Sequence, residues 1–298
     1  MIVITAPTGN IGSGVVEQVL GADEPVRVIV RDPSRLPGPV RDRVEVVRGS
    51  HGDADVVNEA FEGADAVFWL VPSDPRAPSV QAAYAGFARP GIEAFARHGV
   101  RHVVGISALG RGTAVAGRAG HVTATLAMDD LIASSGVHYR ALTNPSFMEN
   151  TLHSVHSIRT PGTFTSPIAA DRKLPVVATR DIAAVAAGLL LDRGWSGVEE
   201  VPVLGPQDLS ADDMARIISE VLATPVTYRQ MPGEALKDSL TGHGMSEPMA
   251  QAMVDMMLAK DAGLDSAVTR TPRSSTPTTF RQWCQEVLKP AFDAVQDA

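Results

Sequence analysis

The sequence predicts an α/β protein with a doubly wound parallel sheet and a smaller, mostly helical C-terminal lobe. Three observations predict it. Short β-branched runs alternate with helical patterns through the first 150 residues, and a glycine-containing turn joins the first strand to the first helix. After residue 150 this regular alternation of strand and helix patterns ends. Strands that alternate with helices form right-handed βαβ units, and such units build a parallel sheet.

Apolar runs predict six strands, at residues 2–5, 26–30, 44–47, 66–71, 102–106 and 139–143, with helices at 55–61, 80–98 and 122–135. The fourth strand is almost continuously apolar, as expected for a strand covered on both faces. Pro90 is expected to break or kink its helix. Because ligands bind beyond the carboxyl ends of such strands, the residues that follow each strand are the candidates for function.

The second half predicts extended pieces at residues 162–165 and 172–175, a helix at 181–191, a strand at 200–204 and a helix at 210–222. We therefore assign residues 1–150 to the sheet domain, and residues 176–205 belong to the same domain. Residues 151–175 and 206–298 are assigned to the lobe.

Composition excludes several classes of protein. The net charge of −8 and the pI of about 5.5 make a nucleic-acid partner unexpected. Cys284 is the only cysteine, so neither a disulfide framework nor a thiolate metal cluster is expected, and we predict no metal site. With no signal-peptide pattern and no run of ~20 apolar residues, the sequence favours a cytoplasmic protein without a membrane partner.

The most informative segment is residues 5–12, TAPTGNIG, which follows a strand and opens a helix. Its spacing is A-x-x-G-x-x-G, and in this context it predicts the dinucleotide turn of a Rossmann sheet, where backbone N–H groups face a phosphate. The alternative is an ordinary strand-to-helix turn. The residues expected to contact the cofactor are Ala6, Thr8, Gly9, Asn10, Ile11 and Gly12.

The second strand is followed by Arg31, where an NAD-specific protein usually has an acidic residue. An arginine there can bind a 2′-phosphate, and Arg35 lies one helical turn further on, so NADP(H) is the expected cofactor. The alternative is that Arg31 lies free on the surface and Asp32 binds the ribose. After the third strand, Asp53 is expected either to bind the adenine amine or to cap the following helix.

Other candidates follow the later strands. Ser107 ends the fifth strand, where its hydroxyl can bond a substrate carbonyl or the nicotinamide ribose, unless it is an ordinary strand-end serine. Asn144 is expected to reach the carboxamide and Phe147 to pack on the nicotinamide ring. Leu70, Val71 and Pro72 follow the fourth strand and are also expected to line the cofactor.

Several segments together resemble the NmrA-like, atypical branch of the short-chain dehydrogenases/reductases. They are residues 5–12, 30–35 (VRDPSR), 63–72 (GADAVFWLVP), 134–139 (SSGVHY), 144–150 (NPSFMEN) and 178–184 (ATRDIAA), in the right order along nearly the whole chain. The resemblance implies a Rossmann domain with a small C-terminal substrate lobe and an NADP(H) site. Members include NADPH-dependent quinone, azo and triphenylmethane-dye reductases, and regulatory proteins that bind the dinucleotide without turnover.

The chain departs from the superfamily in its acid–base residues. The Tyr-x-x-x-Lys pair is absent, since Tyr84 and Tyr139 lack the lysine. Where many NmrA-like reductases carry a histidine, the aligned position is Thr125, and His121 lies one turn earlier. The catalytic candidates are therefore Ser107, Thr125 and His121, the last with a surface histidine as its alternative.

These features predict an NADPH-dependent reductase that passes hydride to a conjugated, apolar aromatic acceptor such as a quinone. A quinone needs little proton assistance, so orientation and electrostatics can supply most of the rate. The alternative is a redox sensor that binds NADP(H) with little or no catalysis, and a third reading is a natural-product tailoring enzyme. The sequence identifies neither the substrate nor the oligomeric state, and a homodimer stays open.

Overall fold

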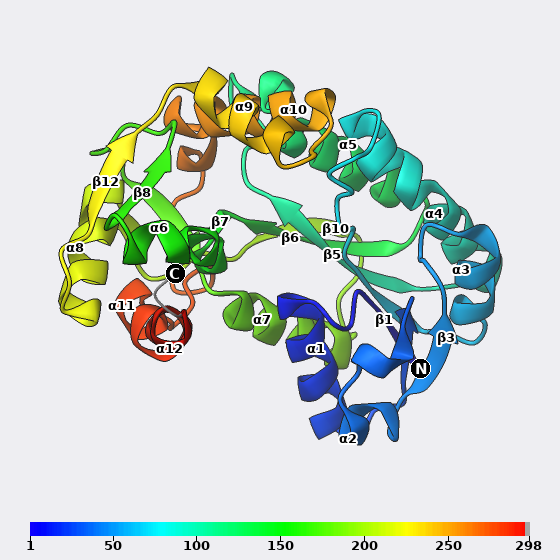
Figure 1. Cartoon of the computed structure of the whole chain (residues 1–298). Helices are drawn as coiled ribbons and strands as arrows, with labels where there is room; N and C mark the ends of the chain where they lie inside the picture. Colours follow the sequence, from blue (N-terminus) through cyan, green and yellow to red (C-terminus); the bar gives the residue numbers. More distant parts are fainter. Residues whose placement is uncertain (296–298) are drawn as a thin grey trace. The chain divides into compact units, whose positions relative to one another are not determined.

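The computed structural model describes residues 1–295 (Figure 1). The chain folds into two compact units. Unit 1 comprises Met1–Ala108, Ala124–Thr143 and Ile182–Val201. Unit 2 comprises Leu109–Thr123, Asn144–Asp181 and the described residues from Pro202 onward.

Unit 1 is built on a seven-stranded sheet in the order β10-β6-β5-β4-β1-β2-β3 (Figure 1). The strands are β1 (Ile2–Thr5), β2 (Val26–Val30), β3 (Glu45–Arg48), β4 (Ala66–Trp69), β5 (His102–Ala108), β6 (His138–Asn144) and β10 (Val198–Pro202). The pairs β1–β2, β1–β4, β2–β3 and β4–β5 are parallel. The predicted doubly wound α/β fold is therefore confirmed, with the order reversing at β1 and β4.

The helices associated with this sheet are α1 (Asn10–Gly21), α2 (Gly38–Arg41), α3 (Ala54–Phe61), α4 (Phe87–His98), α5 (His121–Ala133) and α7 (Thr179–Leu191). α1 buries Ile11, Val15, Val16, Val19 and Leu20, the side chains whose spacing predicted it. Full burial of such a side chain contributes roughly 1.5–3 kcal/mol. This burial fixes the start of α1 against the sheet, directly after β1.

Pro90 does not break its helix, contrary to one of the two sequence expectations. α4 runs through Pro90, and a π-helical turn, η2 (Ala82–Gly86), precedes it. Proline clashes with the carbonyl four residues earlier in a regular α-helix, and that residue is Gly86, where the π turn ends. The wider turn therefore lets the helix continue.

Unit 2 contains two small sheets. They are β11-β9-β7, formed by β7 (Ser146–Phe147), β9 (Leu174–Val177) and β11 (Asp208–Leu209), and β12-β8, formed by β8 (Thr163–Ser166) and β12 (Thr227–Gln230). The helices are α6 (Val155–Arg159), α8 (Ala211–Leu222), α9 (Gly233–Gly242), α10 (Glu247–Asp261), α11 (Phe280–Trp283) and α12 (Lys289–Ala294). The core includes Ile218, Phe280, Trp283 and Cys284, so the cysteine is a buried packing residue.

The strand predicted at residues 200–204 lies two residues earlier, as β10. Val203 and Leu204, which favoured the later position, are buried, and Leu204 donates its backbone N–H to Ser274 of unit 2. Their apolar character serves the core of unit 2, whereas β10 itself is an exposed edge strand. Among the described residues, no helix is both long and apolar enough to cross a membrane.

Candidate cofactor and active site

The glycine turn after β1 has the close backbone approach that a dinucleotide turn needs. Ala6 has a φ of +50°, and its carbonyl accepts the Gly9 N–H at 3.1 Å. A Cβ on Gly12 would lie 2.1 Å from the Ala6 oxygen, so only glycine fits there. Ala6 therefore holds a conformation that usually requires glycine.

The N-terminus of α1 is open for a phosphate. Gly9 is the N-cap of α1. It has no side chain, so no N-cap side chain accepts a hydrogen bond from the first N–H groups of the helix. The Ile11 side chain is buried, so this residue offers only its backbone to a ligand. Thr8 is half-buried, while Gly9 and Asn10 are exposed. Free N–H groups and the positive end of the helix dipole together suit a pyrophosphate.

Thr5 ties this turn to the end of β4. Its hydroxyl donates to the Phe68 carbonyl at 3.0 Å and accepts the Leu70 N–H at 2.9 Å. Leu70 and Val71 are half-buried and Pro72 is exposed. The predicted cofactor residues after β1 and after β4 are therefore held at the same edge of the sheet.

The arginines expected to read the 2′-phosphate are exposed after β2. Arg31 and Arg35 flank Asp32, whose carboxylate accepts from the Ser34 hydroxyl at 2.7 Å and from the Ser34 N–H at 3.0 Å. These bonds, with Arg35 and Arg48 nearby, lower the pKa of Asp32. Both bonds end on Oδ1 of Asp32, which caps its own turn, and binding of a ribose hydroxyl by Asp32 stays the alternative prediction.

Arg48 is a cationic residue that the sequence analysis did not single out. It ends β3 and lies opposite Val30 in the parallel register of β2 and β3, so its exposed guanidinium is close to the turn that begins at Arg31. The sequence shows an arginine at the end of a predicted strand. Its place beside Arg31 follows only from the pairing of β2 with β3.

After β3, Asp53 is the N-cap of α3 and accepts the Asp55 N–H at 3.3 Å. The cap interpretation therefore describes its local contact, and adenine binding stays a prediction. His51, which the sequence analysis also missed, lies buried with its Nε2 2.9 Å from the Leu70 carbonyl and its ring edge-on to Trp69 and Phe87. Burial lowers the pKa of His51 to about 4, so the ring is neutral near pH 7.

Ser107 belongs to a buried network in unit 1. Its hydroxyl donates to Asp129 Oδ2, and the Tyr139 hydroxyl donates to Asp129 Oδ1 at 2.6 Å. All three side chains are at most 5% exposed. Because a hydroxyl has one proton, Ser107 presents acceptor lone pairs to any further partner. This favours a bond from a ribose hydroxyl over a bond to a substrate carbonyl.

The other two catalytic candidates are both buried. Thr125 lies on α5, in unit 1, and is 9% exposed. In unit 2, the His121 ring lies 3.1 Å from the Met249 carbonyl, and burial lowers its pKa. The alternative of a surface histidine is therefore wrong, because α10 covers the ring.

The segment after β6 begins unit 2. The Asn144 carbonyl accepts the Leu109 N–H at 3.1 Å, and the Asn144 side chain is buried. Phe147 is half-buried in β7, opposite Val177 of β9. Both candidate residues are thus held by backbone pairing within unit 2.

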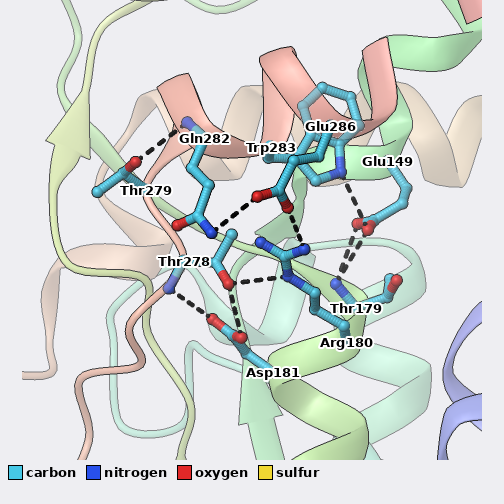
Figure 2. A network of polar contacts seen from close by, with 9 residues as sticks. All are labelled: Glu149, Thr179, Arg180, Asp181, Thr278, Thr279, Gln282, Trp283 and Glu286. Atoms are coloured by element: carbon cyan, nitrogen blue, oxygen red, sulfur yellow. Dashed lines mark hydrogen bonds and ion pairs between the residues drawn. The ribbon is translucent and has the colours of Figure 1, made fainter. Parts of the chain in front are cut away.

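Glu149 anchors this segment in a polar network that Figure 2 shows. Its carboxylate accepts the Thr179 N–H at 3.1 and 3.2 Å and the Trp283 Nε1–H at 3.1 Å. Thr179 begins α7, so the negative charge of Glu149 also lies at the positive end of a helix. The carboxylate therefore joins segment 144–150 to segment 178–184, two of the segments that carry the family resemblance.

The same network continues to the start of α11 (Figure 2). Asp181 accepts from the Thr278 N–H at 3.0 Å and from its hydroxyl at 2.8 Å, while Arg180 donates to the Thr278 hydroxyl and pairs with Glu286. No local pattern in the sequence predicts this arrangement, since it joins residues about a hundred positions apart. It is a structural scaffold for the segment that holds Asn144 and Phe147.

Comparison with known proteins agrees with this geometry. The NAD(P)H-binding family matches residues 7–193. The chain is 31% identical over 293 residues to a (4-alkanoyl-5-oxo-2,5-dihydrofuran-3-yl)methyl phosphate reductase of Streptomyces griseus, covering 96% of this chain and 97% of the relative. It is 30% identical over 256 residues to an NAD(P)H azoreductase of Xenophilus azovorans, covering 86% of each.

A solved structure shares the fold over nearly the whole chain. It is an NADPH-dependent quinone oxidoreductase of Escherichia coli in complex with NADPH, with a TM-score of 0.76, 22% identity, and coverage of 97% of this chain and 100% of that one. The family match and the near-full-length relative establish that the chain belongs to the NAD(P)H-binding family.

Proposed function

We propose that the chain is an NADPH-dependent reductase that transfers hydride to a conjugated, apolar aromatic acceptor such as a quinone. The observation that carries the proposal is its relationship to two reductases along most of their lengths, combined with an open dinucleotide turn. The cofactor supplies the hydride when bound, and the chain's residues hold and orient it.

The preference for NADPH over NADH rests on charge. Arg31 and Arg35 are exposed after β2 with Arg48 on the neighbouring strand, while Asp32 is engaged by Ser34. A guanidinium binds a phosphate through charge-assisted, often bidentate hydrogen bonds. These arginines favour a ligand that carries a 2′-phosphate.

The remaining assignments complete the proposal. Residues 151–175 and 206–298 form the substrate lobe, and Asn144 and Phe147 are the residues that contact the nicotinamide or the acceptor. The protein acts in the cytoplasm on a small molecule, without nucleic acid or membrane partners, and a homodimer is compatible with this activity. The net charge of −8 supports the absence of a nucleic-acid partner.

The test is NADPH oxidation, followed at the nicotinamide absorbance, with a panel of quinones, azo dyes and conjugated ketones. We expect turnover with at least one class. Binding of NADPH without turnover of any acceptor would contradict the proposal and favour the redox sensor, which the missing Tyr-x-x-x-Lys pair otherwise supports. Calorimetry with NADPH and NADP⁺ then distinguishes a sensor, because a sensor must bind the two forms with different affinity.

A further inference from the structure

Leu70 is the first residue after β4, at the point where the strand order of the unit 1 sheet reverses. The order runs β3-β2-β1 on one side of this point and β4-β5-β6 on the other. In a doubly wound sheet the ligand binds outside the carboxyl ends of the strands at such a reversal. The neighbouring strand ends at Thr5, and the dinucleotide turn begins directly after it, at Ala6. The backbone of Leu70 therefore belongs to the edge where the dinucleotide is expected.

Side chains from two other strand ends hold the backbone of Leu70 on both sides. The Leu70 N–H donates to the Thr5 hydroxyl oxygen at 2.9 Å, and that hydroxyl donates to the Phe68 carbonyl at 3.0 Å. The Leu70 carbonyl oxygen lies 2.9 Å from Nε2 of His51, which follows β3. One residue after β4 is thus tied to the end of β1 and to the segment after β3.

The bond to Leu70 determines which nitrogen of His51 carries a proton. A carbonyl oxygen can only accept, so Nε2 is the protonated nitrogen and the donor. The ring is 5% exposed and stands edge-on to Trp69 and to Phe87, with centroid separations of 5.2 and 4.8 Å. Burial lowers the pKa of His51 to about 4, so the ring stays neutral near pH 7. His51 is therefore a neutral donor in a fixed orientation.

Two glycines allow the aromatic rings to pack where they do. A Cβ on Gly52 would lie 2.6 Å from Cε2 of Phe87, and a Cβ on Gly91 would lie 2.4 Å from Cη2 of Trp69. Any larger residue would displace the ring that it meets. The orientation of His51 therefore depends on a packed arrangement to which the segment after β3, the end of β4 and α4 all contribute.

We propose that His51 is a positioning residue for the dinucleotide: its Nε2–H holds the backbone of Leu70 at the strand edge, and the affinity for NAD(P)H depends on that bond. Thr5 has the same role through the Leu70 N–H. The inference rests on the dinucleotide binding of the family and not on turnover, so measurements of affinity test it. The choice between NADPH and NADH stays with the arginines after β2.

Replacing His51 by leucine removes the donor and keeps an apolar side chain of moderate size. We expect the Kd for NADPH, measured by calorimetry, to rise by about 10-fold, the scale of one lost hydrogen bond. The Kd for NADH should rise by the same factor, because the lost bond lies away from the residues that read the 2′-phosphate. His51→Gln restores an N–H donor near the place of Nε2, and its Kd should stay within about threefold of the wild type.

His102→Leu is the matched control. His102 is also buried, its Nε2 lies 3.1 Å from the Trp195 carbonyl oxygen, and its ring is edge-on to Trp195 at 4.6 Å. It begins β5, however, so it lies at the amino ends of the parallel strands, away from the dinucleotide edge. We expect this variant to lower the unfolding midpoint as His51→Leu does, but to leave the Kd for NADPH within about twofold.

Thr5 provides a second and independent test of the same backbone. Thr5→Val removes the hydroxyl and keeps the shape, so the Kd for NADPH should rise by about 5- to 10-fold, whereas Thr5→Ser keeps the hydroxyl and should bind like the wild type. If both side chains act through Leu70, their effects are coupled. The double variant His51→Leu/Thr5→Val should therefore raise Kd by clearly less than the product of the two single effects.

Three results would overturn the proposal. They are a folded His51→Leu protein whose Kd for NADPH stays within about twofold of the wild type, a His102→Leu protein that loses as much affinity, and a His51→Gln protein as weak as His51→Leu. If His51→Leu does not fold, Thr5→Val and Thr5→Ser decide, and equal affinities of these two would overturn it. A wild type that binds NADPH but reduces no acceptor would overturn the proposed function and leave the role of His51 standing.

Discussion

The Ser107 hydroxyl donates its proton to Asp129, and the same carboxylate accepts the hydroxyl proton of Tyr139. The carboxylate is 3% exposed, so it accepts both hydroxyl protons away from water. This relationship joins the end of β5 to α5 and β6, and it commits the Ser107 proton to the carboxylate.

Replacing Asp129 by asparagine should destabilise the protein. An amide has one acceptor oxygen and a donor nitrogen, so one of the two hydroxyls would face another donor. We expect the free energy of unfolding to fall by about 1–3 kcal/mol, the cost of a buried unsatisfied group. Urea unfolding followed by circular dichroism measures it. An unchanged unfolding midpoint would show that the carboxylate is not needed as a double acceptor.

Gly12→Ala should disrupt the dinucleotide turn. The new methyl group would lie 2.1 Å from the Ala6 carbonyl oxygen, so the backbone must move. We expect the Kd for NADPH to rise by at least ~10-fold, corresponding to ~1.4 kcal/mol. Gly21→Ala in the same helix is the control, because no described heavy atom lies within 4 Å of a Cβ there. Equal affinities of the two variants would contradict the close approach seen at Gly12.

Glu149→Gln should loosen the segment after β6. The glutamine keeps one acceptor oxygen for the two donors Thr179 N–H and Trp283 Nε1–H, so we expect a loss of about 1–2 kcal/mol in unfolding free energy. Glu286→Gln removes an exposed partner of Arg180 and should cost at most ~1 kcal/mol, as exposed ion pairs do. Urea titrations of both variants compare the two effects, and a larger loss for Glu286→Gln would be inconsistent with Glu149 as the anchor.

His51 should make stability depend on pH below its ordinary pKa of 6.5. Its folded pKa is lowered to about 4, so between pH 6.5 and 4 the unfolded state binds a proton that the folded state does not. Stability contributed by the neutral ring is complete above pH 6.5 and decreases as pH falls to 4, by about 3 kcal/mol in total.

Comparing the wild type with His51→Asn isolates this effect. The slope of unfolding free energy against pH should be smaller in the variant by up to about 1.4 kcal/mol per pH unit in this window. Identical slopes for the two proteins would show that His51 titrates normally in the folded state.

The fold could be predicted because its signals are local. The β-branched run at residues 2–5, the glycine turn and the buried face of α1 lie within a single short segment. Where the prediction failed at β10, Val203 and Leu204 were apolar for a different reason, since they belong to the core of unit 2. The apolar pattern of a segment predicts which residues are buried, but it does not predict which core they pack against.

The candidate site could be predicted only in part for the same reason. Ser107 and Thr125 were singled out as candidates from their places along the chain, but the partner of Ser107 could not be: Asp129 lies 22 positions after it. His121 meets Met249 at a separation of 128 positions, so no local pattern shows that it is covered.

We propose that the chain binds NADPH through its arginines and uses it as the hydride donor. A titration with both reduced dinucleotides, NADPH and NADH, tests this most directly. We predict that the wild type prefers NADPH, and that Arg31→Ala weakens NADPH binding by ~1–3 kcal/mol while leaving NADH binding almost unchanged, since NADH lacks the 2′-phosphate. Arg35→Ala should show a smaller effect of the same sign. A wild-type preference for NADH, or an equal loss of both cofactors in Arg31→Ala, would contradict this account.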